Sequence, residues 1–253
     1  MKVFCDAHLH FSHCKAPDFE PDEGYLCVSS CHFPEEFIFA EERKILCSYG
    51  IHPQIVNGDY FQHDFEAAFY FLEDLCLKKK ICAVGECGFD FYTPEYKSAA
   101  VWQEVVFERQ ALLAENYGLP LVLHLRKSVQ KIFTYTKILS QLPAVIFHSF
   151  PGTVMEADSF LRRGVKAYFS FGKPLLKGKK SAIDCVEKLP LQNLLLETDA
   201  PYQTLKGESE TFPSDIKYVY QKACDLRKIS LDEMSRQIES NFKSAFCLGE
   251  NFL

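Results

Sequence analysis

The sequence lacks several features that would each point to a particular class of protein. Its 253 residues contain no apolar run of the ~18 residues needed to cross a bilayer. An acid, Asp6, comes too early for the apolar region of a secretory signal peptide. No CxxC pair is present, and no glycine-rich dinucleotide-binding fingerprint follows the first apolar stretch. We therefore expect a cytoplasmic protein that makes no contact with a membrane.

Positive charge is also scarce, because 28 Lys and Arg stand against 34 Asp and Glu, a formal net charge of −6. The surface as a whole would not attract nucleic acid, so any polyanion must be held locally, by metal ions or a basic patch. Most of the eleven cysteines lie inside apolar runs, among them Cys27, Cys47, Cys76, Cys82 and Cys185. We expect these thiols to be free and packed as small core side chains.

Eight short, mostly continuous apolar stretches are expected to form strands, beginning near Val3, Gly24, Ile45, Ile81, Pro120, Ala144, Lys166 and Leu194. Segments with helical features separate nearly all of them, including residues 34–44, 64–79, 93–117 and 128–140. Continuous apolar strands with helical crossovers indicate a parallel sheet covered by helices. Eight such units predict an α/β fold, a single (β/α)8 TIM-type barrel over residues 1–253. A doubly wound open sheet is the alternative.

One segment departs from the ideal barrel. Residues 11–23, after the first strand, contain two prolines and no helical period, so we expect a loop there. The barrel would then have a shortened or missing first helix. Two further helices, over residues 214–226 and 231–247, are expected to close the chain.

The first strand ends in a motif that suits metal binding, Asp6-Ala-His-Leu-His10. Side chains on a strand alternate between its faces, which puts Asp6, His8 and His10 on one side. On a helix, two histidines at i and i+2 would diverge by about 200° and could not share an ion. On a strand end they can provide two imidazole nitrogens to one divalent cation. Two unrelated histidines at a strand terminus are the alternative.

Together with His8 and His10, further polar residues fall at predicted strand ends, where active sites of such barrels lie. They are His8, His10, His32, His52, Glu86, His124, His148 and Asp199. Imidazoles and carboxylates that converge from several strands are the ligands of a divalent metal site. The alternative for Glu86 is a turn carboxylate between Gly85 and Gly88.

The number of candidate ligands favours two metal ions over one. His8, His10, Glu86, His124, His148 and Asp199 are too many for one tetrahedral site. Glu86 could bridge two ions ~3.5–4 Å apart, the arrangement used for in-line displacement at phosphorus. We expect His8, His10 and Asp199 on one ion and His124 and His148 on the other. Cys5 and Cys87 adjoin ligands in the sequence, but strand alternation turns them away.

These residues resemble the TatD-type metal-dependent deoxyribonucleases of the amidohydrolase-like barrels. The matching stretches occur in the family's order: Asp6-Ala-His-Leu-His10, Gly50-Ile-His-Pro53, Val84-Gly-Glu-Cys-Gly-Phe-Asp90, Pro120-Leu-Val-Leu-His124, Phe147-His-Ser-Phe150 with Gly152, and Leu196-Glu-Thr-Asp-Ala-Pro201. Ser240-Asn241-Phe242 is similar to the family's closing helix.

The resemblance implies a (β/α)8 fold and phosphodiester hydrolysis of DNA, often from the 3′ end, with two divalent ions (Mg²⁺, Mn²⁺ or Zn²⁺). It implies metal-ligand roles for the six residues named above and a substrate or phosphate role for His52. Three departures put substrate choice in doubt. They are residues 11–23 in place of a helix, His124-Leu-Arg-Lys127 after the fifth strand, and residues 203–213, which lack the family's usual arginine and Asn-x-Pro pattern.

In the expected mechanism, a water acidified by the metals attacks phosphorus. Glu86 bridges the ions, Asp199 is the candidate general base, and His52 assists at the substrate. Rim cations could hold DNA: Arg126 and Lys173 are the predicted substrate contacts, with Lys127, Lys177, Lys179 and Lys180 nearby in sequence. Phe89, Phe91, Tyr92 and Tyr202 could stack on bases. A plain solvated surface and core packing are the alternatives for these cations and aromatics.

Two other functions compete with the nuclease. A small-molecule amidohydrolase, such as a lactonase or phosphotriesterase-like enzyme, often bridges its metals with a modified lysine, and no lysine lies in the fourth strand here. A non-catalytic metal-binding or scaffolding protein would be favoured had a ligand been lost, and none has been. We expect a monomer or weak oligomer.

Overall fold

The computed structural model describes residues 3–15, 24–57 and 59–249, which contain eight strands in one parallel sheet. The strands are β1 (Phe4–Leu9), β2 (Tyr25–Cys31), β3 (Leu46–Tyr49), β4 (Ala83–Asp90), β5 (Leu121–Arg126), β6 (Val145–Phe147), β7 (Ala167–Phe171) and β8 (Leu194–Leu196). Each pairs in parallel with the next in chain order. This consecutive order is that of a barrel.

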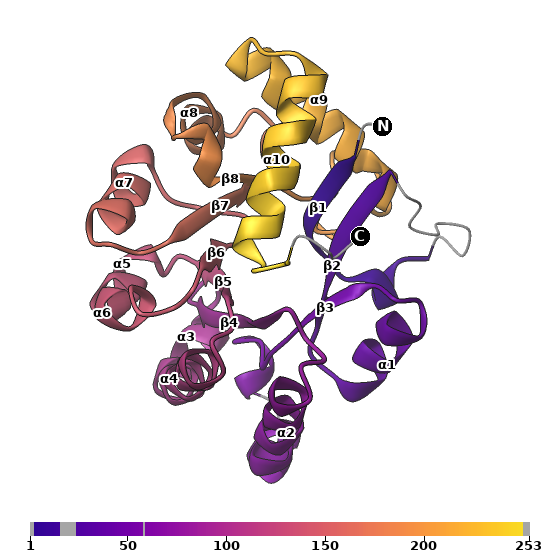
Figure 1. The fold of residues 1–253 in the computed structure, drawn as a ribbon. Helices are drawn as coiled ribbons and strands as arrows, with labels where there is room; N and C mark the ends of the chain where they lie inside the picture. The colour runs from indigo at the N-terminus through magenta and orange to yellow at the C-terminus, as the bar shows by residue number, and fades with distance from the viewer. Residues whose placement is uncertain (1–2, 16–23, 58, 250–253) are drawn as a thin grey trace.

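The first and last strands meet just beyond their carboxyl ends. The Asp199 amide donates a hydrogen bond to the His8 carbonyl at 2.9 Å, and the His10 amide donates to the Ala200 carbonyl at 2.7 Å. The sheet is therefore a nearly closed barrel, seen end-on in Figure 1. The predicted TIM-type fold is confirmed, and the open-sheet alternative is wrong because the strand order does not reverse.

Helices surround the barrel (Figure 1). They are α1 (Pro34–Glu42), α2 (Asp59–Leu77), α3 (Pro94–Ser98), α4 (Ala100–Tyr117), α5 (Val129–Ile132), α6 (Thr136–Leu139), α7 (Val154–Arg162), α8 (Lys180–Lys188), α9 (Ile216–Arg227) and α10 (Leu231–Ala245). None of the helices in the described ranges is both long and apolar enough to cross a membrane. Between β1 and β2 the described residues form one 3-10 turn, η1 (Phe11–His13), and no α-helix. The rest of the predicted loop, residues 16–23, lies outside the described ranges.

Two helices expected to be continuous are interrupted. The segment 93–117 breaks at Ala99 into α3 and α4, and the buried Gln103 side chain donates to the Tyr96 carbonyl at this break, at 2.8 Å. That bond satisfies a carbonyl at the end of α3. The segment 128–140 divides into α5, a 3-10 turn (Phe133–Tyr135) and α6.

Helix α10 closes the amino-terminal end of the barrel. Its buried Met234, Ile238 and Phe242 recur every fourth residue and form one apolar face, each contributing ~1.5–3 kcal/mol through burial. The Asn241 amide donates to the Leu194 carbonyl, where β8 begins, at 2.7 Å. Because α10 lies in front of the barrel in Figure 1, the view is from this end, and the carboxyl ends of the strands point away.

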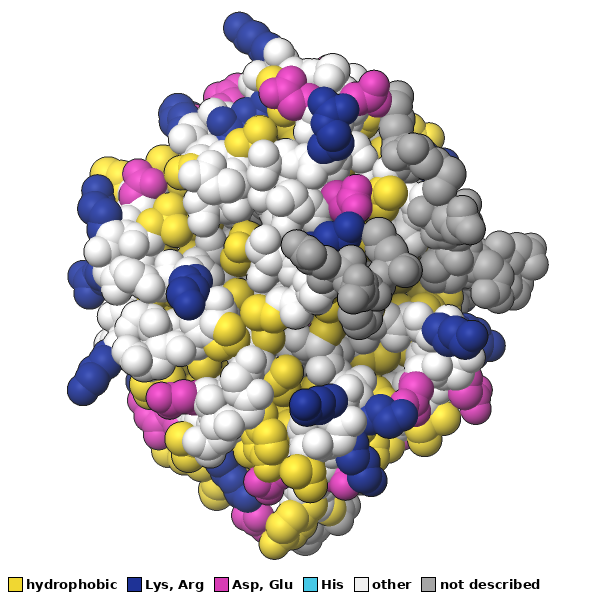
Figure 2. Space-filling view, in the orientation of Figure 1, with side chains coloured by type: hydrophobic (Ala, Val, Ile, Leu, Met, Phe, Trp, Pro, Cys, Tyr) yellow, Lys and Arg dark blue, Asp and Glu magenta, His cyan; other side chains and the backbone are white. Residues whose placement is uncertain are grey.

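Charged side chains of both signs lie on the described part of this amino-terminal face (Figure 2). Figure 2 shows acidic and basic side chains interspersed over it, with no histidine visible. The eleven cysteines are all free, and eight of them are buried, as the sequence predicts. The clustered histidines and acids lie at the opposite end of the barrel.

Candidate metal centre

Glu86 lies inside β4, four residues before its end, and not at the strand terminus expected from the sequence. The pairing of β4 with β5 shifts register between Val84 and Cys87, and such a bulge re-aims the side chain at its position. Gly85 makes this geometry possible, because its φ is +127° and a Cβ there would lie 2.4 Å from the Val122 carbonyl oxygen. The bulge holds a 1% exposed carboxylate at the centre of the barrel.

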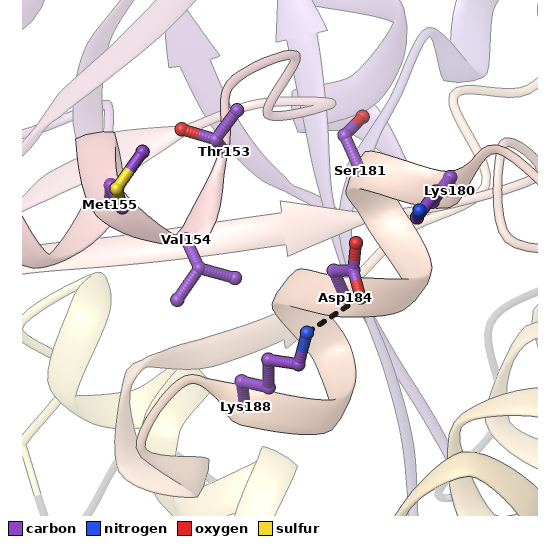
Figure 3. A pocket seen from close by; sticks show the side chains of 7 residues that line it. All are labelled: Thr153, Val154, Met155, Lys180, Ser181, Asp184 and Lys188. Carbon is purple, nitrogen blue, oxygen red and sulfur yellow. Dashed lines mark hydrogen bonds and ion pairs between the residues drawn. The ribbon is translucent and has the colours of Figure 1, made fainter.

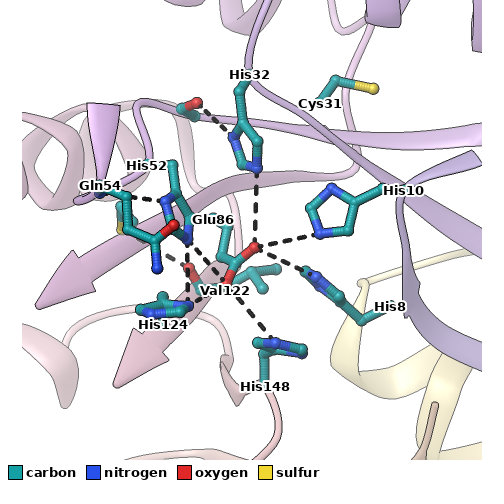
Figure 4. Close-up of polar contacts among 12 residues, drawn as sticks. His8, His10, Cys31, His32, His52, Gln54, Glu86, Val122, His124 and His148 are labelled. Carbon is teal, nitrogen blue, oxygen red and sulfur yellow. Dashed lines mark hydrogen bonds and ion pairs between the residues drawn. The ribbon is translucent and has the colours of Figure 1, made fainter. Parts of the chain in front are cut away.

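One oxygen of that carboxylate faces histidines from the first two strands. Glu86 Oε2 lies 3.3 Å from Nε2 of His8, 3.9 Å from Nε2 of His10 and 3.8 Å from Nε2 of His32. Figure 4 shows the three rings converging on this oxygen. The sequence places His32 at a strand end without giving it a role, and the structure brings its ring to the same oxygen as the His-x-His pair.

The other oxygen faces histidines from three later strands. Glu86 Oε1 lies 2.6 Å from Nδ1 of His124, 3.5 Å from Nε2 of His52 and 3.7 Å from Nε2 of His148. In Figure 4, His52 and His124 approach from the side opposite His8 and His10, whereas the His148 ring stacks on the His8 ring, with 3.7 Å between the centroids. A single carboxylate therefore has imidazole nitrogens on both of its oxygens, which is the arrangement a bridging ligand requires.

Asp199 approaches the same space from the end of β8. Its Oδ1 lies 3.5 Å from His10 Nε2 and 3.7 Å from His8 Nε2, and its Oδ2 lies 4.0 Å from His148 Nε2. The Gln203 side chain donates to that Oδ2 at 2.8 Å and orients the carboxylate. The structure thus brings together all six residues predicted as metal ligands.

Three sets of side chains have ligand atoms mutually within 4.8 Å: His8 with His10 and Glu86, His8 with His148 and Asp199, and His52 with His124 and Glu86. The expected division of ligands between two ions differs from these sets. His148 groups with His8 and Asp199 in the structure, whereas the sequence analysis pairs it with His124. His52, expected at the substrate, lies in the His124 set.

Buried acids behind the rings decide which imidazole nitrogen faces Glu86. His148 Nδ1 lies 3.1 Å from Glu197 Oε2, and His124 Nε2 lies 3.2 Å from Asp90 Oδ2. Such carboxylates fix the orientation and raise the basicity of metal-binding histidines. Neither acid has a role predicted from the sequence. Glu197 could have been found from its place two residues before Asp199. Asp90 could not, because the strand predicted from the sequence ends at Glu86, whereas β4 continues to Asp90.

Asp6 contributes to the centre through hydrogen bonds to neighbouring segments. Its carboxylate accepts hydrogen bonds from the Thr198 amide at 2.9 Å, the Thr198 hydroxyl at 2.6 Å and the Tyr25 hydroxyl at 2.8 Å. Burial raises the pKa of Asp6 to about 7. These bonds tie β1 to β2 and to the residues after β8, so Asp6 positions the strand that carries His8.

The electrostatics of the cluster suit a cation. Burial lowers the pKa of His32 to about 3 and that of His52 to about 4, which keeps both rings neutral. Burial opposes ionisation of Glu86, yet the neighbouring His148 and His8 hold its pKa well below the ordinary value. Neutral imidazoles beside ionised carboxylates are the donors that divalent first-row metals take. The buried Nε2 atoms of His8 and His32 also have no hydrogen-bond partner.

The rim residues predicted to hold substrate have contrasting surroundings. The Arg126 guanidinium lies 3.7 Å from the centroid of the half-exposed Tyr92 ring, and Lys127 Nζ lies 4.6 Å from it. Lys173 is only 1% exposed, and its ammonium forms ion pairs with Glu208 and, at 2.8 Å, with Asp215. An ammonium held by two acids is not available to a phosphate at the rim.

Among the aromatic candidates, Phe89 is fully buried, whereas Tyr92 and Tyr202 are about half exposed. The Tyr202 hydroxyl lies 2.9 Å from His13 Nδ1, and His13 Nε2 lies 2.8 Å from Glu36 Oε1. The sequence gives no signal for this chain of contacts. Lys180 belongs instead to a surface pocket between α7 and α8 (Figure 3). No predicted metal ligand lines that pocket.

The barrel and the cluster of imidazoles and acids at its carboxyl end define a class, the metal-dependent barrel hydrolases. Within that class the chain belongs to the family of TatD related DNases, whose model matches residues 5–247. The resemblance inferred from the motifs is thereby confirmed. The chain is a metal-dependent hydrolase that acts on ester bonds.

Similar proteins cover almost the whole chain. The "Uncharacterized metal-dependent hydrolase YjjV" of Escherichia coli K12 is 28% identical over 96% of this chain and 97% of that protein. The crystal structure of YjjV, described as a TatD homolog, superposes with a TM-score of 0.82 at 25% identity, covering 97% of this chain and 98% of that one. The "3'-5' ssDNA/RNA exonuclease TatD" of Pantoea ananatis is 30% identical over 70% of each chain.

Proposed function

We propose that the chain is a 3′–5′ exonuclease that hydrolyses phosphodiester bonds of single-stranded DNA with two divalent cations. The single observation that carries this proposal is the position of Glu86, whose two oxygens each face a separate group of imidazoles. Relatives named as 3′–5′ single-stranded DNA/RNA exonucleases support the substrate class.

The residues present fit two cations. His8, His10 and Asp199 would hold one, His124 and His148, both beside Glu86 Oε1, would hold the second, and Glu86 would bridge them. Zn²⁺, Mn²⁺ and Mg²⁺ are the candidate ions. When bound, such cations supply an acidified water and neutralise charge on the phosphoryl oxygens.

The chain's own residues carry the proton and the substrate contacts. Coulombic interaction with His148 lowers the pKa of Asp199 to about 2 despite its burial, so its carboxylate is ionised and able to take a proton from the attacking water. The Gln54 backbone N–H donates to His52 Nδ1 at 3.2 Å, so the proton of the neutral ring is on Nε2. His52 Nε2–H faces Glu86 and can donate to a phosphate oxygen. Arg126, stacked on Tyr92, provides a cation for the DNA backbone.

The test is incubation of the purified protein with single-stranded DNA labelled at either end, with added Zn²⁺, Mn²⁺ or Mg²⁺ and with a chelator. We expect mononucleotides from the 3′ end only in the presence of a metal, and none from the Glu86→Gln variant. Glu187→Gln, which makes the same change on the exposed face of α8, is the matched control and should retain activity. Hydrolysis of a p-nitrophenyl ester or a lactone with intact DNA would favour a small-molecule hydrolase instead.

A further inference from the structure

His32 is a histidine of the metal centre that the predicted ligand set omits, and its side chain is only 8% exposed. It follows β2, and its Nε2 lies 3.8 Å from Glu86 Oε2 without any hydrogen-bond partner (Figure 4). Buried side-chain nitrogens are almost always paired in folded proteins. An orphaned nitrogen aimed at an ionised carboxylate therefore needs a partner that the polypeptide does not provide.

The other nitrogen of the ring determines what Nε2 offers. His32 Nδ1 lies 3.0 Å from the Gly50 carbonyl oxygen. A carbonyl oxygen can only accept, so Nδ1 must carry the proton. A neutral His32 then directs the lone pair of Nε2 toward Glu86. A backbone carbonyl on the far nitrogen is a common way to fix the tautomer of a metal-binding histidine.

The neighbouring histidine has the opposite polarity, although the two ring centroids are only 5.1 Å apart. His52 Nδ1 accepts a hydrogen bond from the Gln54 backbone N–H at 3.2 Å, and an N–H group can only donate. His52 therefore presents an N–H to the centre, while His32 presents a lone pair. Similar burial and a similar distance from Glu86 conceal two different chemical functions.

The backbone around His32 holds the ring in place. Its amide donates to Glu36 Oε2 at 2.6 Å, and the Phe33 amide donates to the same oxygen at 3.3 Å. The second oxygen of Glu36 lies 2.8 Å from His13 Nε2. Glu36 thus anchors the start of α1 and fixes the residue from which the His32 ring projects.

We propose that His32 is a further metal ligand, on the same cation as His8 and His10. This inference rests on the metal centre of the proposed function. With metal–nitrogen bonds of ~2.1 Å, ligand atoms around one ion are separated by roughly 3.0–4.2 Å. The distances of 3.3, 3.9 and 3.8 Å from Glu86 Oε2 to the three Nε2 atoms fall in that range. None of the three compact sets of ligand atoms includes His32, so its ring must move toward His8 and His10 when the cation binds.

The added imidazole has a consequence for metal choice. Three nitrogens beside the bridging carboxylate make this cation site richer in nitrogen than an oxygen-seeking ion prefers. The site should select Zn²⁺, or another late first-row dication, over Mg²⁺. His32 thereby becomes a determinant of which metal the enzyme uses.

His32→Asn separates ligation from a structural role. The asparagine amide can still donate to the Gly50 carbonyl from the position of Nδ1, but nothing replaces the Nε2 lone pair. His13→Gln is the matched control, because His13 bonds Tyr202 and Glu36 and not Glu86. Metal content per chain and Zn²⁺ affinity, by competition with a chromogenic chelator, are measured on both variants and the parent.

We expect His32→Asn to lower the affinity for one of the two Zn²⁺ ions at least about 10-fold. Even the outer-shell partners of metal ligands contribute 10–100-fold to metal affinity. Its preference for Zn²⁺ over Mg²⁺ should fall as well, while His13→Gln should bind both ions like the parent. Unchanged Zn²⁺ affinity in a folded His32→Asn protein would overturn the proposal. Weakened Zn²⁺ binding together with DNA left intact by the loaded parent would instead overturn only the nuclease function.

A second measurement needs no variant. Histidine ¹⁵N–¹H correlation spectra of the metal-free protein report which ring nitrogen carries the proton. We expect His32 to be protonated on Nδ1 and His52 on Nε2. A proton on His32 Nε2 would leave no lone pair for a metal and would overturn the assignment.

Discussion

Glu197 Oε2 lies 3.1 Å from Nδ1 of His148 and leaves Nε2 of that ring facing Glu86. The other oxygen of Glu197 accepts from the Ser149 amide at 2.9 Å, so the carboxylate is fixed before any cation arrives. The orientation of His148, a predicted metal ligand, therefore depends on Glu197, which is not itself a predicted ligand.

Replacing that acid should weaken metal binding without removing a ligand. Glu197→Gln keeps the size of the side chain but lowers the basicity of His148 and allows its ring to turn. We expect a 10–100-fold loss of metal affinity, measured by chelator competition. Glu187→Gln, on the exposed face of α8, is the control and should bind metal normally. Equal affinities in the two variants would refute the orienting role of Glu197.

Metal binding should release protons. Burial opposes protonation of His148, but the nearby Glu197, Glu86 and Asp199 raise its pKa to about 10. The metal-free ring is therefore protonated at neutral pH. A cation can bind Nε2 only after that proton leaves, so affinity should increase as the pH rises from 6 toward the raised pKa. Calorimetric titrations in two buffers of different ionisation enthalpy count the released protons. Binding enthalpies that are independent of the buffer would contradict this prediction.

The bulge in β4 should depend on Gly85. Alanine at a φ of +127°, with its Cβ 2.4 Å from the Val122 carbonyl oxygen, must move one of the two strands. We expect Gly85→Ala to lower the free energy of unfolding by at least about 1–3 kcal/mol, measured with urea. Gly164→Ala also has a positive φ, of +82°, but nothing within 4 Å of its Cβ, and it should cost less. The reverse order would show that the bulge does not constrain this position.

Arg126 and Lys173 should respond differently to substitution. Lys173→Met leaves Asp215 without its 2.8 Å ion pair, so we expect a loss of about 1–3 kcal/mol in unfolding free energy. Arg126→Ala removes a guanidinium that stacks on the exposed Tyr92 ring, so it should leave stability nearly unchanged while weakening DNA binding, more so at low salt. A melting curve and a DNA titration of each variant separate the two cases. Weaker DNA binding by Lys173→Met at unchanged stability would restore its predicted substrate role.

Much of the fold could be predicted from the sequence, because strands buried on both faces form continuous apolar runs with helical segments between them. The convergence of the histidines was also predictable, since the carboxyl ends of parallel strands meet at one end of a barrel. The structure places His8, His10, Glu86, His124, His148 and Asp199 around one space. Their roles as ligands remain predictions.

What the sequence did not reveal depends on contacts between distant segments. The orientation of Glu86 arises from a register shift between β4 and β5. The sequence signals this shift only through Gly85 and Gly88, which both adopt positive φ in the structure. The burial of Lys173 depends on Glu208 and Asp215, 35 and 42 residues further along the chain. The polarity of His32 depends on the carbonyl of Gly50, at the end of a neighbouring strand.

Anomalous diffraction from crystals of the Zn²⁺-loaded protein tests the bridging role of Glu86 most directly. We predict two peaks ~3.5–4 Å apart, one beside each carboxylate oxygen of Glu86, as in two-metal hydrolases. The peak beside Oε2 should lie within bonding distance of His8, His10 and His32. A single peak, or two peaks that Glu86 does not join, would contradict the account.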